Sequence, residues 1–428
     1  MKKQRKYIKC KLLLFMASLL LLWCCAREAG FSNDPTEGSV NVSFHAQLPA
    51  QLVSPKSYAL SAVDENYIKE IDILEFKDSG SGLKLSKRIK ATDITGSGTE
   101  SNQKTFKGAL TTGTFVYVFL ANSSSVLDGL SLSYDASMSK DTVMDLLVFQ
   151  HAGKWKSTSS SDFSPIPMWA ETKDPVTITN NTTSLAGLSF MRSLLRVDVK
   201  VDLGVQGKFK IEEVQVRNSN AKGYVAPLSS NYSWDTTDAT KLNVNKASVP
   251  SSASSGAPLV YTDATTANIS FDHSIYLFES GKQSQTLNNT CLIIGGSYNN
   301  GAKTYYRVDF LKDGVHMDLL RNHLYTFNIT DVKAAGYSSA DDAFNAGATN
   351  RMVSEILDWN QMALDNVDFD GQYWLGLSSV EVKTSQLAKT LALSVQTNAI
   401  GGWKAKTVNA DGSADVNYSW LALSKTSG

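Results

Sequence analysis

Several segments of the chain alternate apolar and polar residues with the two-residue period of a β-strand. Residues 195–202, LRVDVKVD, place Leu and Val on one face and put Arg196 and Asp198 on the other. The same alternation occurs in residues 305–310 (YYRVDF), 324–332 (LYTFNITDV) and 391–397 (LALSVQT). Such patterns predict antiparallel strands with one face on a core and the other face in solvent.

Three further patterns complete the predicted elements. Residues 114–122, TFVYVFLAN, are apolar on both faces and predict a central strand that is covered on both sides. Residues 139–147 predict a helix capped at Ser139 or Asp141, and residues 295–301, GGSYNNG, predict a hairpin turn. Many short strands separated by Ser, Thr, Asn and Gly loops predict an all-β protein built from β-sandwich domains.

The N-terminus has the pattern of an export signal. Six Lys and Arg residues precede an apolar run from Leu12 to Trp23, which is shorter than the roughly 20 residues of a membrane span. The run ends in cysteine, as in bacterial lipoprotein signals, so residues 1–24 are the predicted signal. Cys25 is the expected lipidated residue, because lipidation of Cys24 would place the bulky Trp23 at the cut. The two alternatives are that Cys24 is lipidated and that neither cysteine is modified.

Removal of the signal changes the charge balance. It takes away six basic residues and no acids, which leaves 35 Lys and Arg against 41 Asp and Glu, a net charge of −6. A negative chain without a basic cluster argues against nucleic-acid binding. With Cys25 lipidated, Cys291 is the remaining cysteine, so stability must come from burial rather than a disulfide. About 400 residues suffice for two or three domains.

The sequence offers no catalytic or metal-binding constellation. Its five histidines lack HExxH and HxH spacing, no cysteine pair is available for zinc, and no G-x-S-x-G or phosphate loop occurs. The densest group is His316, Asp318 and His323 in HMDLLRNH, which precedes a predicted strand and is more simply structural. We therefore expect no cofactor, no metal site and no enzymatic activity.

The order of the predicted strands resembles the fimbrillin family of Bacteroidetes, lipoprotein pilins that build fimbriae from two-sandwich subunits. Five segments between residues 40 and 360 carry the resemblance: YIKEIDILEFKDSG, TFVYVFLAN, PIPMWAE, SFMRSLLRVDVKV and LLRNHLYTFNITDVKAAG. The resemblance implies one sandwich in 25–200 and another in 201–365. It also implies a location at the outer membrane, through the lipid anchor, or in a surface fimbrium, with other fimbrial subunits as partners.

For the fimbrillins, a surface protease removes the first strand, and the vacated groove accepts an extended segment of the neighbouring subunit. The family is cut after an arginine some tens of residues beyond the lipid cysteine. In this chain Arg27 is the only arginine between Cys25 and Arg88, and it stands too early to release a strand. Lys56, in a Pro/Ser loop after the first strand candidate SVNVSFHAQL, is the candidate processing site. The alternative is a solvated loop lysine in a protein that stays lipid-anchored.

Residues 366–428 are similar to the small Ig-like module called BACON, with Trp403 and Trp420 at its tryptophan positions and its last strands missing. Because the family donates its C-terminal segment, a module there would occupy the donor end. This predicts an accessory or tip subunit that supports adhesion, with host or bacterial surface glycans or proteins as further partners. The alternative function is a glycan-binding surface lipoprotein of the outer membrane.

Overall fold

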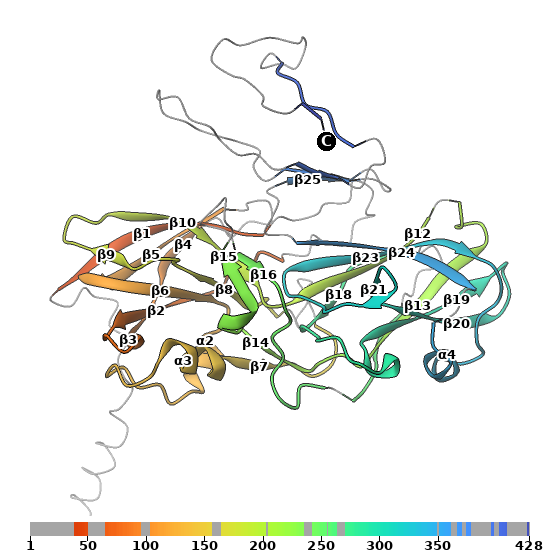
Figure 1. The fold of residues 1–428 in the computed structure, drawn as a ribbon, viewed down its shortest axis with the longest axis horizontal. Helices are drawn as coiled ribbons and strands as arrows, with labels where there is room; N and C mark the ends of the chain where they lie inside the picture. Colours follow the sequence, from red (N-terminus) through yellow and green to blue (C-terminus); the bar gives the residue numbers. More distant parts are fainter. Residues whose placement is uncertain are drawn as a thin grey trace, which may run out of the picture.

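The computed structural model describes residues 38–49, 65–95, 103–155, 164–202, 204–234, 242–254, 256–262, 270–348 and 351–360, and the stretches 366–369, 374–377, 395–397, 402–408 and 426–427. Two β-sandwiches follow one another along the long axis of the molecule (Figure 1). Most strand pairs are antiparallel, and the all-β prediction is confirmed. Within the described residues, no helix has the length and apolarity that crossing a membrane requires.

The first sandwich packs a four-stranded sheet on a larger one. The four-stranded sheet has the order β10 (Ser184–Ser189), β1 (Ser39–Gln47), β5 (Gln103–Thr111) and β4 (Thr92–Thr95). The facing sheet has the order β11 (Met191–Arg192), β8 (Met168–Glu171), β6 (Gly113–Ala121), β2 (Ile71–Asp78) and β3 (Leu83–Lys90), and β9 (Val176–Ile178) pairs with β6. Apolar side chains of both sheets form the core between them.

Strand β6 is central in its sheet and buried on both faces. It pairs with β2 on one side and with β8 on the other. Phe115, Tyr117 and Phe119 belong to the core of the first sandwich, whereas Val116 and Val118 belong to a second cluster on the opposite face. The central strand predicted from the apolar run is therefore confirmed.

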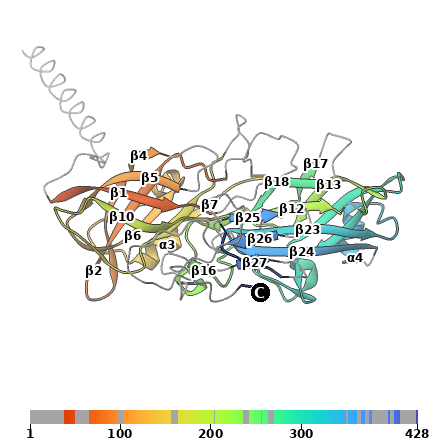
Figure 2. The ribbon, with the colours of Figure 1, turned by 90° about the horizontal axis from the view of Figure 1, so that it is seen from above.

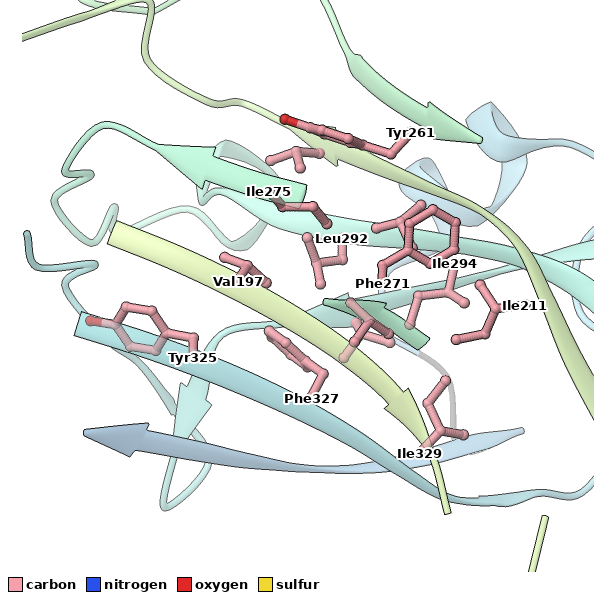
Figure 3. Close-up of a cluster of buried hydrophobic side chains, with 14 of the residues drawn as sticks. Val197, Ile211, Tyr261, Phe271, Ile275, Leu292, Ile294, Tyr325, Phe327 and Ile329 are labelled. Carbon is pink, nitrogen blue, oxygen red and sulfur yellow. The ribbon is translucent and has the colours of Figure 1, made fainter. Parts of the chain in front are cut away.

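The second sandwich has two four-stranded sheets. One has the order β18 (Ser270–Leu277), β12 (Leu195–Val201), β23 (His323–Val332) and β24 (Met352–Asn360). The other has the order β17 (Leu259–Thr262), β13 (Phe209–Arg217), β19 (Cys291–Tyr298) and β20 (Lys303–Asp309). Figure 3 shows the core, in which Phe327 and Ile329 lie among side chains of both sheets. The apolar faces predicted for β20 and β23 point into the core as expected. The polar face predicted for β20 is not in solvent, because Arg307 and Asp309 are 1% and 4% exposed and form an ion pair.

Two small elements flank this sandwich. The hairpin of β21 (Leu311–Lys312) and β22 (Val315–His316) extends from the end of β20. Helix α4 (Ala340–Ala346) packs Ala343 against the outer face of β19, where Cys291 and Ile293 are fully buried.

Strand β12 departs from the prediction. It lies inside its sheet, antiparallel to β18 and parallel to β23, and its charged face is not solvated. Arg196 is 3% exposed and Asp198 is 2% exposed. Arg196 donates hydrogen bonds to Glu65 at 2.5 Å and to Asp198 at 3.1 Å. The partner that makes this burial possible stands far earlier in the chain, where the local alternation of residues gives no sign of it.

The hairpin predicted at residues 295–301 is present, but its turn is shorter than predicted. Residues 299–302 connect the two strands, and the backbone nitrogen of Gly301 donates a hydrogen bond of 2.9 Å to the carbonyl oxygen of Tyr298 across Asn299 and Asn300, whose φ angles are +50° and +58°. Gly296 lies within β19. A Cβ atom at this position would come within 2.2 Å of the carbonyl oxygen of Lys210 in the neighbouring strand β13. This glycine therefore permits a close approach of two strands rather than a turn.

The predicted helix is α3 (Lys140–Leu146). Its cap is Ser139, whose Oγ accepts a hydrogen bond of 3.2 Å from the backbone nitrogen of Thr142, while Asp141 lies in the first turn. Val143 and Leu147 are fully buried in a hydrophobic cluster, whereas Leu146, which the helical period places on the same face, is 42% exposed.

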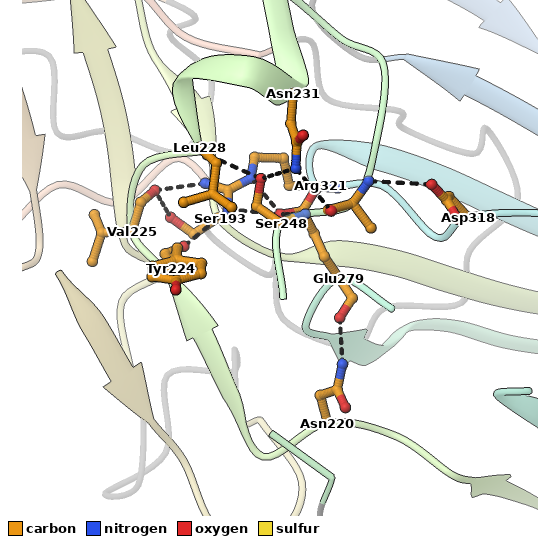
Figure 4. Close-up of polar contacts among 11 residues, drawn as sticks. Ser193, Asn220, Tyr224, Val225, Leu228, Asn231, Ser248, Glu279, Asp318 and Arg321 are labelled. Atoms are coloured by element: carbon orange, nitrogen blue, oxygen red, sulfur yellow. Dashed lines mark hydrogen bonds and ion pairs between the residues drawn. The ribbon is translucent and has the colours of Figure 1, made fainter. Parts of the chain in front are cut away.

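A buried polar network lies at the junction of the two sandwiches (Figure 4). Arg321 and Glu279 form an ion pair of 2.7 Å, and each side chain is 1% exposed. Arg321 also donates hydrogen bonds to the carbonyl oxygens of Tyr224 and Val225, and Glu279 accepts one from the backbone of Ser248. The network reaches β14 (Lys222–Tyr224) through the carbonyl oxygen of Tyr224, and β14 pairs with β7 (Val148–Gln150). The remaining short elements are α2 (Ser124–Asp128) and the paired strands β15 (Tyr232–Trp234) and β16 (Leu242–Val244).

After β24, the described residues form a three-stranded sheet with the order β25 (Asn366–Phe369), β26 (Trp374–Leu377) and β27 (Val395–Thr397). Much of the predicted BACON-like module, including Trp420, lies outside the described residues. The module and the domain boundaries at residues 200 and 365 therefore stay predictions.

Candidate strand-exchange site

Strand β1 presents an apolar residue to the core at every second position. Val42 and Phe44 are fully buried, Ala46 is 3% exposed, and Leu48 just beyond the strand is also 3% exposed. The residues between them are exposed or half-buried. Each of the three larger side chains contributes about 1.5–3 kcal/mol by leaving water, so β1 fills an apolar trough.

The backbone of β1 is paired on both sides (Figure 2). It runs antiparallel to β5 from the pair Ser39–Thr111 to the pair Gln47–Gln103. It runs parallel to β10, with four paired positions that begin at Ser43. Loss of β1 would therefore leave unpaired backbone groups on two strands beside an empty trough, and an added strand satisfies both.

The centre of the trough is aromatic. The ring of Phe44 stacks on Phe106 with centroids 4.9 Å apart and meets the edge of Phe119 at 5.1 Å. Gly108 stands opposite Val42, and a Cβ atom there would lie 2.6 Å from Cδ1 of Ile73. The glycine thus leaves space for large side chains at the middle of the strand.

A carboxyl group is buried at one end of the trough. Glu75 of β2 is fully buried, and its Oε1 accepts a hydrogen bond of 2.7 Å from the backbone nitrogen of Thr111, which pairs with the first residue of β1. Its Oε2 has no hydrogen-bond partner among the described residues. Burial raises the pKa of Glu75, although the hydrogen bond from Thr111 and the charge of Lys87 act in the opposite direction.

The two ends of segment 50–64, which contains Lys56, are held together. Nδ2 of Asn66 donates a hydrogen bond of 3.0 Å to the carbonyl oxygen of Pro49, two residues after β1. Nη2 of Arg192 donates one of 2.7 Å to Oδ1 of Asn66. A chain cut between these ends would therefore lose the covalent link to β1 without losing this contact.

Glu65 attaches the chain that follows this segment to the second sandwich. Its carboxylate is 2% exposed and accepts hydrogen bonds from Arg196 of β12 at 2.5 Å and from the hydroxyl of Tyr276 of β18 at 2.7 Å. Burial lowers the pKa of Arg196, but the carboxylates of Asp198 and Glu65 outweigh it and the pKa is raised. Glu65 is thus held to the second sandwich by contacts that do not involve β1.

Both residues that the sequence singled out for modification, Cys25 and Lys56, lie outside the described residues. Their roles in lipidation and processing remain predictions.

The structure does not bring the HMDLLRNH residues into one site. Nδ1 of His323 lies 2.6 Å from Oδ1 of Asp358, whereas Asp318 accepts a hydrogen bond of 2.8 Å from the backbone of Lys282. In the part of the chain that the structure describes, no three His, Cys, Asp or Glu side chains are grouped as metal ligands.

Two residues of this site were missed by sequence reasoning. Glu65 stands in no strand pattern, and nothing local marks it as an ion-pair partner. Glu75 follows Ile71 and Ile73 at the strand period, so its place on the apolar face of β2 was available from the sequence.

No family model matches the sequence, and no curated protein matches it. Among solved structures, the tip fimbrial protein Mfa3 from Porphyromonas gingivalis with C-terminal truncation is similar at 11% identity, with 75% of this chain and 100% of that chain covered and a TM-score of 0.43. The fimbrilin (fimA) from Porphyromonas gingivalis W83 is similar at 13% identity, with coverages of 74% and 96% and a TM-score of 0.40. A fimbrial assembly protein from Parabacteroides distasonis ATCC 8503 is similar at 11% identity, with coverages of 75% and 96% and a TM-score of 0.39. Likenesses this distant assign no residue of this chain a role.

Proposed function

We propose that this protein is a structural subunit of a surface fimbrium, without enzymatic activity, and that it accepts an extended strand of a neighbouring subunit in the place of β1. The observation that carries the proposal is the position of β1, which is an interior strand with an apolar face and ends beside the predicted processing segment. The strand order that resembles the fimbrillins supports the same role.

The proposed route to the surface begins with lipidation of Cys25, which anchors the exported chain in the outer membrane. A cut in segment 50–64, at Lys56, then frees β1. Because Glu65 is held by Arg196 and Tyr276, the new N-terminal end stays attached to the second sandwich while the trough opens.

We assign the subunit an accessory position in the fimbrium, with adhesion as its contribution. The basis is the residues after β24, which include a small sheet and the predicted BACON-like module at the end of the chain that the family resemblance implies is donated. A position at the tip additionally requires that no segment of this chain is donated to another subunit.

Shearing of fimbriae from cells tests the proposal. The subunit should be recovered in polymers that resist mild detergent, and immunogold directed at the second sandwich should label the fibres. Gold confined to fibre ends indicates a tip subunit, and gold along the shaft indicates incorporation within it. Recovery of the protein only in the membrane fraction, with unlabelled fibres, would contradict the proposal.

A further inference from the structure

The C-terminal end of β1 is held by a side chain from another part of the chain. Gln47 is the last residue of β1 that pairs with β5, and its carbonyl oxygen accepts a hydrogen bond of 2.9 Å from the backbone nitrogen of Phe190. The next two residues, Leu48 and Pro49, are both buried. The carbonyl oxygen of Pro49 accepts a hydrogen bond of 3.0 Å from Nδ2 of Asn66.

We propose that Asn66 recognises the end of the strand that occupies the β1 position and couples the presence of that strand to the junction between the two sandwiches. The inference rests on the proposed function, because only a strand that is replaced has to be recognised. The recognised feature is a backbone carbonyl group two residues beyond the last residue that pairs with β5.

The chain on both sides of Asn66 is held by contacts that do not involve β1. The preceding residue, Glu65, is bound to the second sandwich. Asn122, directly after β6, donates a hydrogen bond of 2.8 Å to the carbonyl oxygen of Tyr67 and accepts one of 2.8 Å from the backbone nitrogen of Lys69. We therefore expect Asn66 to stay beside the trough when β1 leaves.

The carboxamide of Asn66 has one orientation that suits both of its neighbours. Its Nδ2 donates to Pro49, while its Oδ1 accepts a hydrogen bond of 2.7 Å from Nη2 of Arg192. Asn66 is 1% exposed. Rotation of the carboxamide by half a turn would set donor against donor at Arg192 and acceptor against acceptor at Pro49. The carbonyl group of the strand therefore favours the orientation in which Asn66 binds Arg192.

Arg192 connects Asn66 to the second sandwich. Its Nε donates a hydrogen bond of 3.2 Å to the carbonyl oxygen of Glu65, and its backbone nitrogen donates one of 3.2 Å to Oδ1 of Asn322, directly before β23. The backbone nitrogen of Asn322 donates one of 2.8 Å to the carbonyl oxygen of Leu194, directly before β12. Hydrogen bonds thus link the end of the exchanged strand to the start of two strands of the second sandwich.

This arrangement recognises the length of a strand and not its sequence, since every residue has a backbone carbonyl group. A strand that stops at the position of Gln47 or Leu48 lacks the acceptor that Asn66 binds. Loss of a partner by a buried amide is unfavourable, so a strand that reaches position 49 is preferred. The junction is then most stable when the trough is filled to its end.

Two peptides that differ only in this carbonyl group test the inference. The mature chain, carrying a specific protease site within residues 50–64, is cut, and its N-terminal fragment is removed in guanidinium chloride. The remaining chain is refolded with a labelled, C-terminally amidated peptide of residues 38–49, or with the same peptide in which pyrrolidine replaces Pro49. Both peptides keep Leu48 and the five-membered ring, but the second has no carbonyl group at position 49. We expect the first to bind about fivefold to thirtyfold more tightly.

Asn66→Asp is the matched acceptor variant, because a carboxylate can still accept from Arg192 but cannot donate to the carbonyl group of residue 49. In this variant the preference for the amidated peptide should disappear or reverse. Its persistence would overturn the role of Asn66. The comparison of the two peptides on the chain with Asn66 unchanged decides the question even if Asn66→Asp does not fold.

Hydrogen exchange measures the coupling. The backbone amides of Arg192 and Asn322 should exchange at least about fivefold more slowly with the amidated peptide than with the pyrrolidine peptide, while those of β19 and β20 should not change. A side chain that only packs against the strand would not produce this difference. A preference for the amidated peptide without it would overturn the coupling to the junction.

The two proposals fail in different ways. Equal binding of the two peptides to the chain with Asn66 unchanged would overturn the inference and leave the proposed strand exchange intact. Retention of neither peptide on gel filtration would overturn the proposed function together with the inference.

Discussion

The ring of Phe44 in β1 stacks on the ring of Phe106 in β5, with centroids 4.9 Å apart and ring planes 17° apart. Phe119 from the facing sheet meets the edge of both rings, at 5.1 Å and 5.9 Å. Phe44 therefore gives β1 an aromatic contact with both sheets at its centre, in addition to its backbone pairing and the buried Val42 and Leu48.

Phe44→Ala should destabilise the first sandwich by about 3–5 kcal/mol, because it removes a fully buried ring and leaves a cavity between Phe106 and Phe119. Ser43→Ala is the matched control on the outward face, with an expected change below about 0.5 kcal/mol. Denaturant unfolding, with hydrogen exchange of β5 and β6 to identify the sandwich affected, measures both. Changes of similar size in the two variants would show that β1 does not depend on its aromatic anchor.

Glu75→Gln should stabilise the protein near neutral pH. The folded-state pKa of Glu75 is raised above its ordinary value of 4.5, so the stability associated with the neutral carboxyl is complete below pH 4.5 and is lost as the pH rises through the folded value. Glutamine keeps an oxygen that can accept from Thr111 and has no charge to desolvate. The gain should be on the order of 1 kcal/mol at pH 7 and should shrink towards pH 4.

Melting curves of wild type and Glu75→Gln at several pH values measure this difference. The exposed Glu212 of β13 supplies the control Glu212→Gln, which should change the melting temperature little at any of them. A Glu75→Gln effect that is independent of pH would mean that the buried carboxyl is not the cause.

Glu65→Ala should lower the free energy of unfolding by about 3–5 kcal/mol, because it leaves Arg192 and Arg196 buried without one of their carboxylate partners. Hydrogen exchange should increase in β12 and β18 and leave β19 and β20 protected. A loss of stability no larger than that caused by Glu212→Ala would show that Glu65 does not hold the segment after residue 64 to the second sandwich.

Cys25→Ser should abolish incorporation of labelled palmitate, whereas Cys24→Ser should retain it. Lipidation attaches a diacylglycerol to the thiol of the residue that becomes the mature N-terminus, and serine at position 25 has no thiol to modify. Incorporation into Cys25→Ser and its loss in Cys24→Ser would reverse the assignment of the two cysteines.

Periodicity predicted the apolar faces of the strands, and it was wrong about the polar faces of β12 and β20, which are buried. Tyr325, Phe327 and Ile329 alternate with polar residues and are buried as expected. Arg196 and Asp198 follow the same rule, yet they are buried, because charged residues from distant parts of the chain neutralise one another at the junction between the sandwiches. Such pairings depend on tertiary contacts and have no local signature.

In the candidate site, too, local features were predictable from the sequence and long-range pairing was not. The apolar face of β1 was predictable from SVNVSFHAQL, and so was a loop after it. The interior position of β1 between a parallel and an antiparallel neighbour depends on β10, more than 130 residues further along the chain, and was beyond the reach of local patterns.

The most direct test of strand exchange is the N-terminus of the subunits in polymers. Fimbriae sheared from cells and unpolymerised protein from the same membranes are separated, and the N-terminal peptides of both are identified by mass spectrometry. We predict that polymerised subunits begin within residues 50–64 and lack residues 38–49, while the unpolymerised protein begins at lipidated Cys25. Polymerised subunits that retain β1 would contradict the claim that its position is where the neighbouring strand binds.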